Sequence, residues 1–144
     1  MRFRLAVIAW AVLCLGSAHS AQAARLTVNA DGTVSDAVTG LVWQRQDDNQ
    51  TRLWKDALAY CENLVFAGAD TWRLPNVKEL RSIVDDTVTQ PGIDSSVFPN
   101  TKSTGYWTST TRHGAPNFAW YIYFSKGLAS TDMKTNPNYV RCVR

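Results

Sequence analysis

Basic, aromatic and amide side chains gather in one segment near the C-terminal end of this sequence. An arginine can bind a sulfate or a carboxylate through two parallel hydrogen bonds, and a tyrosine ring can stack on a sugar and hydrogen-bond to it. This mixture favours binding of an anionic glycan. In the alternative interpretation, the tyrosines cover a second, smaller core and the basic side chains keep the surface soluble. The candidate ligand-binding residues are Arg112, His113, Asn117, Tyr121, Tyr123 and Lys126.

Residues that could support catalysis are few. His113 is the one histidine after residue 23, and it stands beside Gly114 in a predicted turn, where an exposed imidazole is more common than a catalytic one. No set of Ser, His and Asp is indicated. A close pair of carboxylates for glycoside hydrolysis stays open as an alternative. We nevertheless expect no enzymatic activity.

Two pairs of adjacent carboxylates are candidates for metal binding. Asp47 and Asp48 follow a predicted strand, and Asp85 and Asp86 follow a predicted helix. Calcium needs six or more oxygen ligands, and carboxylates at loops and helix ends are more often solvated or ion-paired. We therefore expect no metal site and no cofactor, with calcium as the alternative.

Charge is distributed unevenly along the sequence. Residues 24–100 carry 7 basic and 11 acidic side chains, whereas residues 101–144 carry 6 basic side chains and the single acidic residue Asp132. Such asymmetry indicates a positive face that could meet an anionic partner. An anionic polysaccharide or cell-surface glycan is therefore the expected partner, with a protein partner as the alternative.

The first residues have the pattern of a secretory signal peptide. Arginines precede an apolar run from Leu5 to Leu15, and Ala21-Gln22-Ala23 matches an A-x-A cleavage site. The run is shorter than the about 20 residues that span a bilayer. We expect residues 1–23 to be a signal peptide and residues 24–144 to form a single exported domain, periplasmic or extracellular. No membrane span and no nucleic-acid partner are expected.

Two cysteines, Cys61 and Cys142, remain in the predicted exported domain. In an oxidising compartment such an even pair indicates a disulfide first, and two free thiols second. The bridge would close a loop of about 80 residues and stabilise the fold by roughly 4 kcal/mol through chain entropy.

The first half of the predicted domain contains short strands and a helix. Residues 25–29 alternate apolar and polar side chains and predict a strand, and a turn at residues 36–40 separates two more short strands. Thr51 is the expected cap of the helix, and Gly68 is its expected stop. The side chains expected on its buried face are Trp54, Leu58, Cys61 and Val65.

The stretch DTWRLPNVKELRSIVDD predicts a change from an extended segment to a second helix. Pro75 cannot donate a hydrogen bond, and Asn76 and Glu79 have the spacing of a capping box. Arg73 is expected to pair with a nearby carboxylate such as Glu79 or Asp85. The side chains expected to be buried here are Trp72, Leu74, Leu80, Ile83 and Val84.

The second half predicts a long loop and an antiparallel sheet. Residues 87–104 are rich in proline and hydroxyl side chains, with Ile93, Val97 and Phe98 as expected anchors. The expected strands are residues 105–112, 118–125 and 138–143. The predicted class is therefore α+β, with two helices packed on twisted antiparallel sheets. The side chains expected on the core face of the middle strand are Phe118, Trp120, Ile122 and Phe124. Tryptophans assigned to packing are Trp43, Trp54, Trp72 and Trp107.

Six blocks of the sequence together resemble a known family. The blocks are TGLVWQR, LWKDALAYCENL, DTWRLPNVKELRSIVDD, VFPNT, YWTST and AWYIYFSKG. In this order they are similar to the Lcl C-terminal domain family, named after a bacterial collagen-like adhesin. The resemblance covers residues 33 to 144 or so. It implies a C-type-lectin-like fold, a secreted lectin-like module that binds sulfated glycosaminoglycans in adhesion, and a disulfide from the first helix to the last strand, which suits Cys61 and Cys142.

Some features of the family and of calcium-dependent lectins are missing. The chain has no collagen repeat, and Asn136-Pro137-Asn138 lacks the carboxylate with which calcium-dependent lectins bind sugar. The hypotheses are therefore a calcium-independent module for anionic glycans or a protein-binding subunit of an envelope or appendage complex. A lectin-fold enzyme is less well supported. Formylglycine-generating enzymes of similar fold work through reactive cysteines, whereas the two cysteines of the predicted exported domain are expected to form a disulfide.

Overall fold

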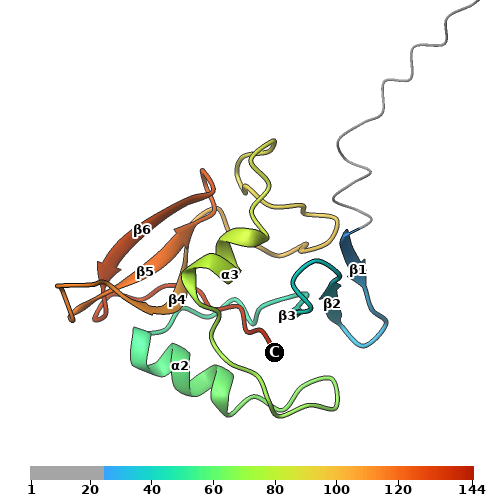
Figure 1. Cartoon of the computed structure of the whole chain (residues 1–144), viewed down its shortest axis with the longest axis horizontal. Coiled ribbons are helices and arrows are strands. Elements are labelled where there is room, and N and C mark those ends of the chain that lie inside the picture. The colour runs from blue at the N-terminus through green and yellow to red at the C-terminus, as the bar shows by residue number, and fades with distance from the viewer. Residues whose placement is uncertain (1–24) are drawn as a thin grey trace, which may run out of the picture.

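The computed structural model describes residues 25–144, which form two antiparallel sheets and two helices (Figure 1). The predicted signal peptide lies outside the described residues. The first sheet has the order β1-β2-β3 and the second β4-β5-β6, so the predicted α+β class with helices on antiparallel sheets is confirmed. The elements are β1 (Leu26–Val28), β2 (Thr33–Asp36), β3 (Val42–Gln44), α2 (Trp54–Glu62), α3 (Val77–Ser82), β4 (Gly105–Thr111), β5 (Phe118–Tyr123) and β6 (Leu128–Met133).

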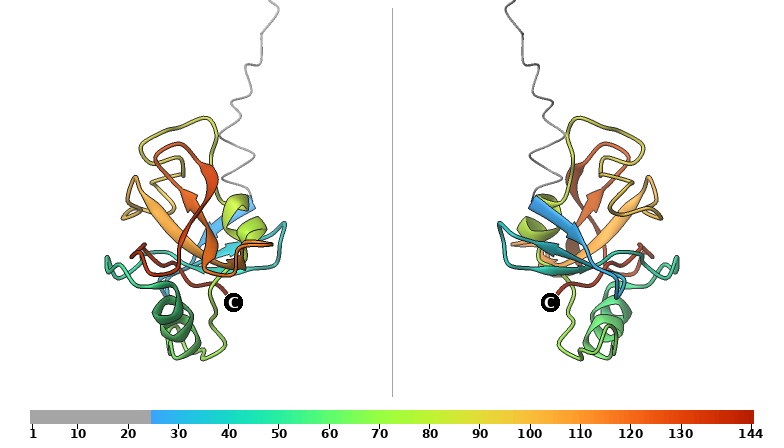
Figure 2. Two further views of the ribbon diagram at one scale, coloured as in Figure 1. Left: turned by 90° about the vertical axis from the view of Figure 1, so that its left-hand side faces the viewer. Right: turned by 90° about the vertical axis from the view of Figure 1, so that its right-hand side faces the viewer.

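The two sheets lie on opposite sides of α3, and α2 lies below the second sheet in Figure 1. Helix α3 contacts β4, β5 and β6, whereas α2 contacts β4. The two side views show the same separation of α2 from α3 (Figure 2). The second sheet therefore has a helix against each of its faces.

Neighbouring side chains of β4 enter two different cores. Tyr106 points into the core that contains α3, and Trp107 points into the core that contains α2, because successive side chains of a strand face opposite sides. We call them the α3 core and the α2 core. Buried in the α3 core are Leu26, Val34, Trp43, Leu80, Ile83, Val84, Ile93, Val97, Phe98, Tyr106, Ile122, Phe124 and Val143. Buried in the α2 core are Ala57, Cys61, Trp72, Leu74, Trp107, Ala119, Val140 and Cys142.

The prediction that β5 has one core face is corrected by this arrangement. Ile122 and Phe124 are fully buried as expected, but Phe118 and Trp120 are only half-buried. Ala119, expected on the outer face, is fully buried in the α2 core. The period-2 alternation of side chains in β5 is as predicted. The sequence of β5 does not show, however, that α2 covers its second face.

Helix α2 is shorter at both ends than predicted. Its N-cap is Leu53 and not Thr51, because Arg52 exchanges two backbone hydrogen bonds with Asn138 and keeps the chain extended up to that point. The helix ends at Glu62, with Asn63 as its C-cap, well before Gly68. Val65, expected on the buried face, is therefore outside the helix and 78 % exposed.

The predicted junction at residues 72–84 is confirmed. Asn76 accepts a hydrogen bond from the backbone N–H of Glu79, and the Glu79 carboxylate accepts one from the backbone N–H of Asn76, which completes a capping box. Arg73 donates to both oxygens of Glu79 at 2.8 Å. The side chains expected to be buried are buried: Trp72, Leu74, Leu80, Ile83 and Val84.

The third strand of the second sheet was placed wrongly by the sequence. It is β6, whose full register pairs Phe118 with Met133 and Tyr123 with Leu128. Residues 138–143 form only isolated bridges, among them Tyr139 with Tyr106. Strand β6 consists largely of small and polar side chains, LASTDM, so its sequence has no apolar alternation to reveal it.

The C-terminal segment nevertheless joins the parts of the molecule. Cys142 is bonded to Cys61 of α2, which confirms the predicted disulfide, although Cys142 lies in this bridging segment and not on a strand. Val143 exchanges backbone hydrogen bonds with Arg73, and Arg144 does so with Val42 of β3. The segment therefore connects α2, the junction and the first sheet.

The long loop between α3 and β4 contains no helix or strand among residues 87–104. Ile93, Val97 and Phe98 are buried in the α3 core, which confirms them as its anchors. Within residues 25–144, no helix is long and apolar enough to cross a membrane.

Candidate functional site

Three predicted binding residues lie together in the turn that joins β4 to β5. Arg112, His113 and Asn117 are all exposed there. The turn is closed by hydrogen bonds from the backbone N–H of Arg112 to the carbonyl of Phe118 at 2.9 Å and from that of Ala115 to the carbonyl of Arg112 at 3.2 Å. The strand pairing of β4 and β5 therefore presents these side chains at one end of the sheet.

Lys134 and Trp54 complete this end of the sheet. The backbone N–H of Lys134 donates to the carbonyl of Asn117 at 2.9 Å, and its ammonium group donates to the hydroxyl of Thr111 at 2.9 Å. The same ammonium lies 3.8 Å from the centroid of the Trp54 ring, a cation–π contact. We call this area the hairpin-end surface, which consists of Trp54, Arg112, His113, Asn117 and Lys134.

Lys126 lies at the other end of β5, away from the hairpin-end surface. It is exposed in the turn that follows β5. A strand of six residues is about 20 Å long at about 3.3 Å per residue. The structure therefore does not bring Lys126 together with Arg112 and Asn117.

The two tyrosines of β5 lie between these ends and are half-buried. Tyr121 packs against the α2 core, with its ring centroid 6.4 Å from that of Trp107. Tyr123 lies edge-on to Tyr121 at 6.4 Å. The interpretation that these rings cover a second core is confirmed for Tyr121, and their part in binding a ligand stays a prediction.

The hairpin-end surface is cationic because few carboxylates approach it. Within the described residues, no ion pair or side-chain hydrogen bond is made by the guanidinium of Arg112. The only acidic side chain of residues 101–144, Asp132, accepts hydrogen bonds from the amides of Asn136 at 2.7 Å and Asn138 at 3.0 Å. The Asp132 carboxylate is thus hydrogen-bonded to side-chain amides and forms no ion pair with a basic side chain of the described residues.

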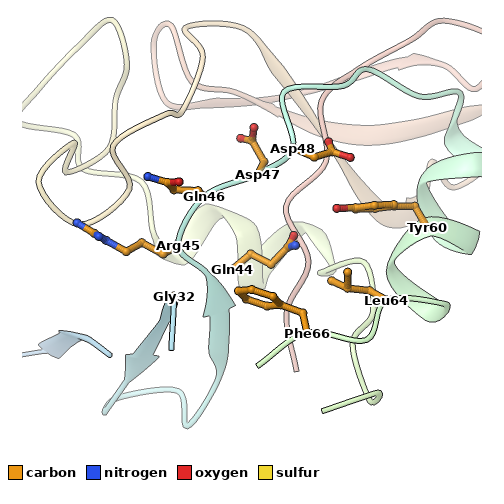
Figure 3. Close-up of a pocket in the computed structure, with 9 residues that line it drawn as sticks. All are labelled: Gly32, Gln44, Arg45, Gln46, Asp47, Asp48, Tyr60, Leu64 and Phe66. Carbon is orange, nitrogen blue, oxygen red and sulfur yellow. The ribbon is translucent and has the colours of Figure 1, made fainter. Parts of the chain in front are cut away.

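A separate cavity of about 460 Å³ lies between the segment after β3 and the C-terminal half of α2 (Figure 3). Two residues of its lining, Asp47 and Asp48, are candidate metal ligands by sequence. The other lining residues come from three separate stretches. The family blocks TGLVWQR and LWKDALAYCENL contain four of them, Gln44, Arg45, Tyr60 and Leu64, but nothing in their spacing predicts a shared cavity. The lining consists of Gly32, Gln44, Arg45, Gln46, Asp47, Asp48, Tyr60, Leu64 and Phe66.

Both carboxylates of this cavity are already bound to protein groups. Asp47 is buried and accepts hydrogen bonds from the hydroxyl of Tyr106 at 2.7 Å and from Arg141 at 3.3 Å. Asp48 accepts two hydrogen bonds from Arg52. Burial alone would raise the pKa of Asp48, but the hydrogen bonds from Arg52 and from the backbone of Gln50 outweigh burial and lower that pKa.

The second pair of carboxylates is also engaged. Asp86 accepts two hydrogen bonds from Arg81, and Asp85 accepts two from Thr87. Among residues 25–144, no three His, Cys, Asp or Glu side chains gather closely enough to hold a metal ion.

Comparison with known proteins places the chain in a family. The sequence model of the Lcl C-terminal domain matches residues 32–144, which is most of the chain and the whole of both sheets apart from β1. No curated protein matches the sequence. The matching domain is adhesin-like and is not known to be catalytic. The chain therefore belongs to the Lcl C-terminal domain family.

Proposed function

We propose that this chain is an exported, non-catalytic module that binds anionic glycans, sulfated or uronic, in adhesion or surface attachment. The hairpin-end surface is the contact site in this proposal. Signal-peptide removal would leave one domain, residues 24–144, with the C-type-lectin-like fold that the family resemblance implies. The disulfide between Cys61 and Cys142 is the kind of bond that exported proteins keep.

One observation carries this proposal, namely the arrangement of cations at the hairpin end. Arg112 offers a planar guanidinium that no carboxylate of the described chain occupies, and such a group binds sulfate or carboxylate through two hydrogen bonds. Lys134 is held on the ring of Trp54 at 3.8 Å and so is positioned at little further cost in side-chain entropy. The site thus combines one free and one fixed cation.

Catalysis gains no support from the same region. The disulfide occupies both Cys61 and Cys142, so the described residues contain no thiol for an enzyme that works through reactive cysteines. His113 is exposed in its turn, and no side-chain hydrogen bond orients its imidazole within the described residues. A binding role is therefore the simpler account of the surface.

Affinity chromatography on heparin tests the proposal. We expect retention that weakens steeply as salt rises, because salt screens contacts between exposed charges. The variant Arg112→Gln with Lys134→Gln should elute at clearly lower salt. The matched control, Lys78→Gln with Lys126→Gln, removes the same charge from exposed positions elsewhere and should elute close to the wild type. If both variants eluted at equally lowered salt, retention would depend on net charge alone and the hairpin-end surface would not be the site. A wild type that is not retained would contradict the proposal.

A protein partner is the second candidate, and the edge strand β6 favours it. Leu128 is 55 % exposed and Met133 is 45 % exposed, although both are apolar. They lie at the two ends of β6, on opposite faces of the sheet. Binding through them would be insensitive to salt and would be lost on Leu128→Ser with Met133→Ser. A glycan-binding module would keep its heparin retention in that variant.

A further inference from the structure

The cavity between β3 and α2 has an apolar side and a polar rim. Phe66 and Leu64 line the apolar side. Gln44, Asp48 and the hydroxyl end of Tyr60 lie across from Phe66, and Gln46 lies at the other end of the cavity, beside Arg45 (Figure 3). Its volume of about 460 Å³ is within the range of small-ligand pockets, roughly 300 to 1,000 Å³, which are mostly apolar with a few placed polar groups.

The apolar side is preformed. The carbonyl of Phe66 accepts a hydrogen bond from the Trp72 indole at 3.0 Å, and the two rings pack at 5.7 Å. Gly32, opposite, has a φ of +85°, and a Cβ there would lie 3.1 Å from Cζ of Phe66. A side chain at position 32 would therefore both strain the backbone and crowd the Phe66 ring.

The polar rim is held in place as well. Asp48 and Arg52 form a two-bond ion pair, and the Arg52 guanidinium lies 3.7 Å from the centroid of the Tyr60 ring. The hydroxyl end of Tyr60 is directed toward Gln44 and Asp48 (Figure 3). Gln46 is exposed, and within the described residues its side-chain amide makes no hydrogen bond. That amide offers two donors and an acceptor to a ligand.

The charge of the lining disfavours an anion. Asp47 and Asp48 are both carboxylates, and Arg45 is the one cation of the lining. Arg45 donates to the backbone carbonyls of Val97 at 3.2 Å and Ser96 at 3.3 Å, so its charge is directed toward the long loop. Asp47 and Asp48 are each paired with an arginine, Arg141 and Arg52. A sulfated or uronic sugar would therefore find no cation directed into this cavity, in contrast to the hairpin-end surface.

We propose that this cavity binds one uncharged pyranose unit of a glycan. A pyranose has an apolar face of C–H groups and a rim of hydroxyl groups, which match the Phe66 side and the polar side of the cavity. The Gln46 amide and the outer edge of the Asp48 carboxylate bind hydroxyl groups of the sugar. This is a second site, separate from the hairpin-end surface, and it does not depend on anionic glycan binding there.

Titration with simple glycosides tests the assignment. The protein, purified with its disulfide formed, is titrated with methyl glycosides of glucose, galactose, mannose and N-acetylglucosamine while the NMR signals of the Tyr60 and Phe66 rings are followed. We expect at least one neutral glycoside to bind with shifts at both rings. Methyl glucuronide and butylamine serve as the anionic and cationic probes.

Variants separate this site from the rest of the surface. Gln46→Ala should weaken the neutral glycoside by about fivefold, the effect of one lost hydrogen bond, whereas Gln50→Ala, an exposed glutamine outside the cavity, should not change it. Arg112→Gln with Lys134→Gln should lower heparin retention and leave glycoside affinity intact. Asp48→Asn should bring the affinity for methyl glucuronide closer to that for the neutral glycoside.

Several results would overturn the assignment. These are no shift at Tyr60 and Phe66 with any glycoside, unchanged affinity in Gln46→Ala, or tighter binding of methyl glucuronide or butylamine than of every neutral glycoside at these rings. Circular dichroism of Gln46→Ala checks that its fold is intact, which is expected because this side chain is exposed and makes no hydrogen bond in the described chain.

Discussion

The α3 core and the α2 core are separated by a single sheet, yet each is fastened by a different kind of bond. Two consecutive residues show the contrast. Arg141 is fully buried on the α3 side, where it donates to the carbonyls of Gln44 and Arg45 and to Asp47. Cys142 is fully buried on the α2 side and is bonded to Cys61. One extended segment thus supplies an ionic fastening to one core and a covalent fastening to the other.

The buried ion pair of Arg141 and Asp47 is tolerated because nearly all of its polar atoms have hydrogen-bond partners. Burial lowers the pKa of Arg141 while the charge of Asp47 raises it, and burial raises the pKa of Tyr106, whose hydroxyl donates to the same carboxylate. Of the three guanidinium nitrogens of Arg141, only Nε has no hydrogen-bond partner in the described chain. Buried ion pairs add little net stability but are costly to break from one side. The α3 core is therefore stabilised by buried polar groups that need one another as partners, Arg141, Asp47 and Tyr106. The α2 core is stabilised by a covalent link between distant parts of the chain.

Removing the disulfide should have the largest effect. Cys61→Ala with Cys142→Ala opens a loop with a sequence separation of 81, and we expect the free energy of unfolding to fall by about 4 kcal/mol. The loss should appear in urea unfolding of the oxidised protein and should be absent when wild type and variant are compared under reducing conditions. A loss of the same size in reductant would show that cavity formation, and not chain connectivity, dominates.

Breaking the ionic fastening should have the next largest effect. Asp47→Ala leaves Arg141 buried without a carboxylate, and we expect a loss of about 3 kcal/mol. This lies at the lower end for a buried pair because Arg141 keeps two backbone carbonyls and the hydroxyl of Thr101.

The neighbouring carboxylate provides the control for that experiment. Asp48→Ala removes a partly exposed pair with Arg52 and should cost less than about 1 kcal/mol. Urea unfolding of both variants measures the difference. Equal losses of unfolding free energy in the two variants would show that the buried Asp47 contributes no more than the partly exposed Asp48. The contrast between the two cores would then not hold.

Acid should weaken the α3 side and leave the covalent fastening intact. Burial raises the pKa of Asp36, but hydrogen bonds from Arg25, Thr39 and the backbone of Val38 outweigh burial and bring that pKa to about 2. The unfolded carboxyl titrates near 3.9. Because the folded pKa is the lower one, the stabilisation of roughly 2 to 3 kcal/mol is present above pH ~4 and is lost as the pH falls from about 4 through about 2.

The comparison that isolates this carboxylate uses Asp36→Asn. Its free energy of unfolding should depend less on pH than that of the wild type between about pH 4 and 2. Asp70→Asn, at an exposed position, should keep the slope of the wild type. Parallel slopes in wild type and Asp36→Asn would contradict the assignment of acid sensitivity to the contact between Arg25 and Asp36.

The sequence predicted best those parts of the fold whose causes are local. The capping box of Asn76 and Glu79 lies within four residues, and the ion pair of Arg73 with Glu79 spans six. The capping box follows from spacing alone, whereas for Arg73 the sequence left Glu79 and Asp85 as alternatives, and the structure shows Glu79. The disulfide was also predictable, because Cys61 and Cys142 were the only two cysteines of the predicted exported domain.

The parts that the sequence did not predict depend on distant residues. The start of α2 is set by Asn138, and the second buried face of β5 is set by a helix about sixty residues earlier. The candidate site was predicted only in part for the same reason. Arg112 and Asn117 share a turn, but only the pairing of β5 with β6 brings Lys134 beside them. The length of β5 separates Lys126 from this turn.

The helix caps provide the smallest and most specific test of the comparison between the cores. Helix α3 has a capping box, whereas the N-cap of α2, Leu53, makes no side-chain hydrogen bond and is 43 % exposed. Leu53 has the extended backbone of an ordinary N-cap, with φ −61° and ψ 153°, so a serine there can accept from the first turn. Leu53→Ser should therefore raise the free energy of unfolding by about 0.5 kcal/mol, whereas Asn76→Ala should lower it by about 1 kcal/mol. If Leu53→Ser is destabilising in urea unfolding, then the exposed leucine contributes packing that outweighs a cap, and α2 depends on its apolar contacts as well as on its disulfide.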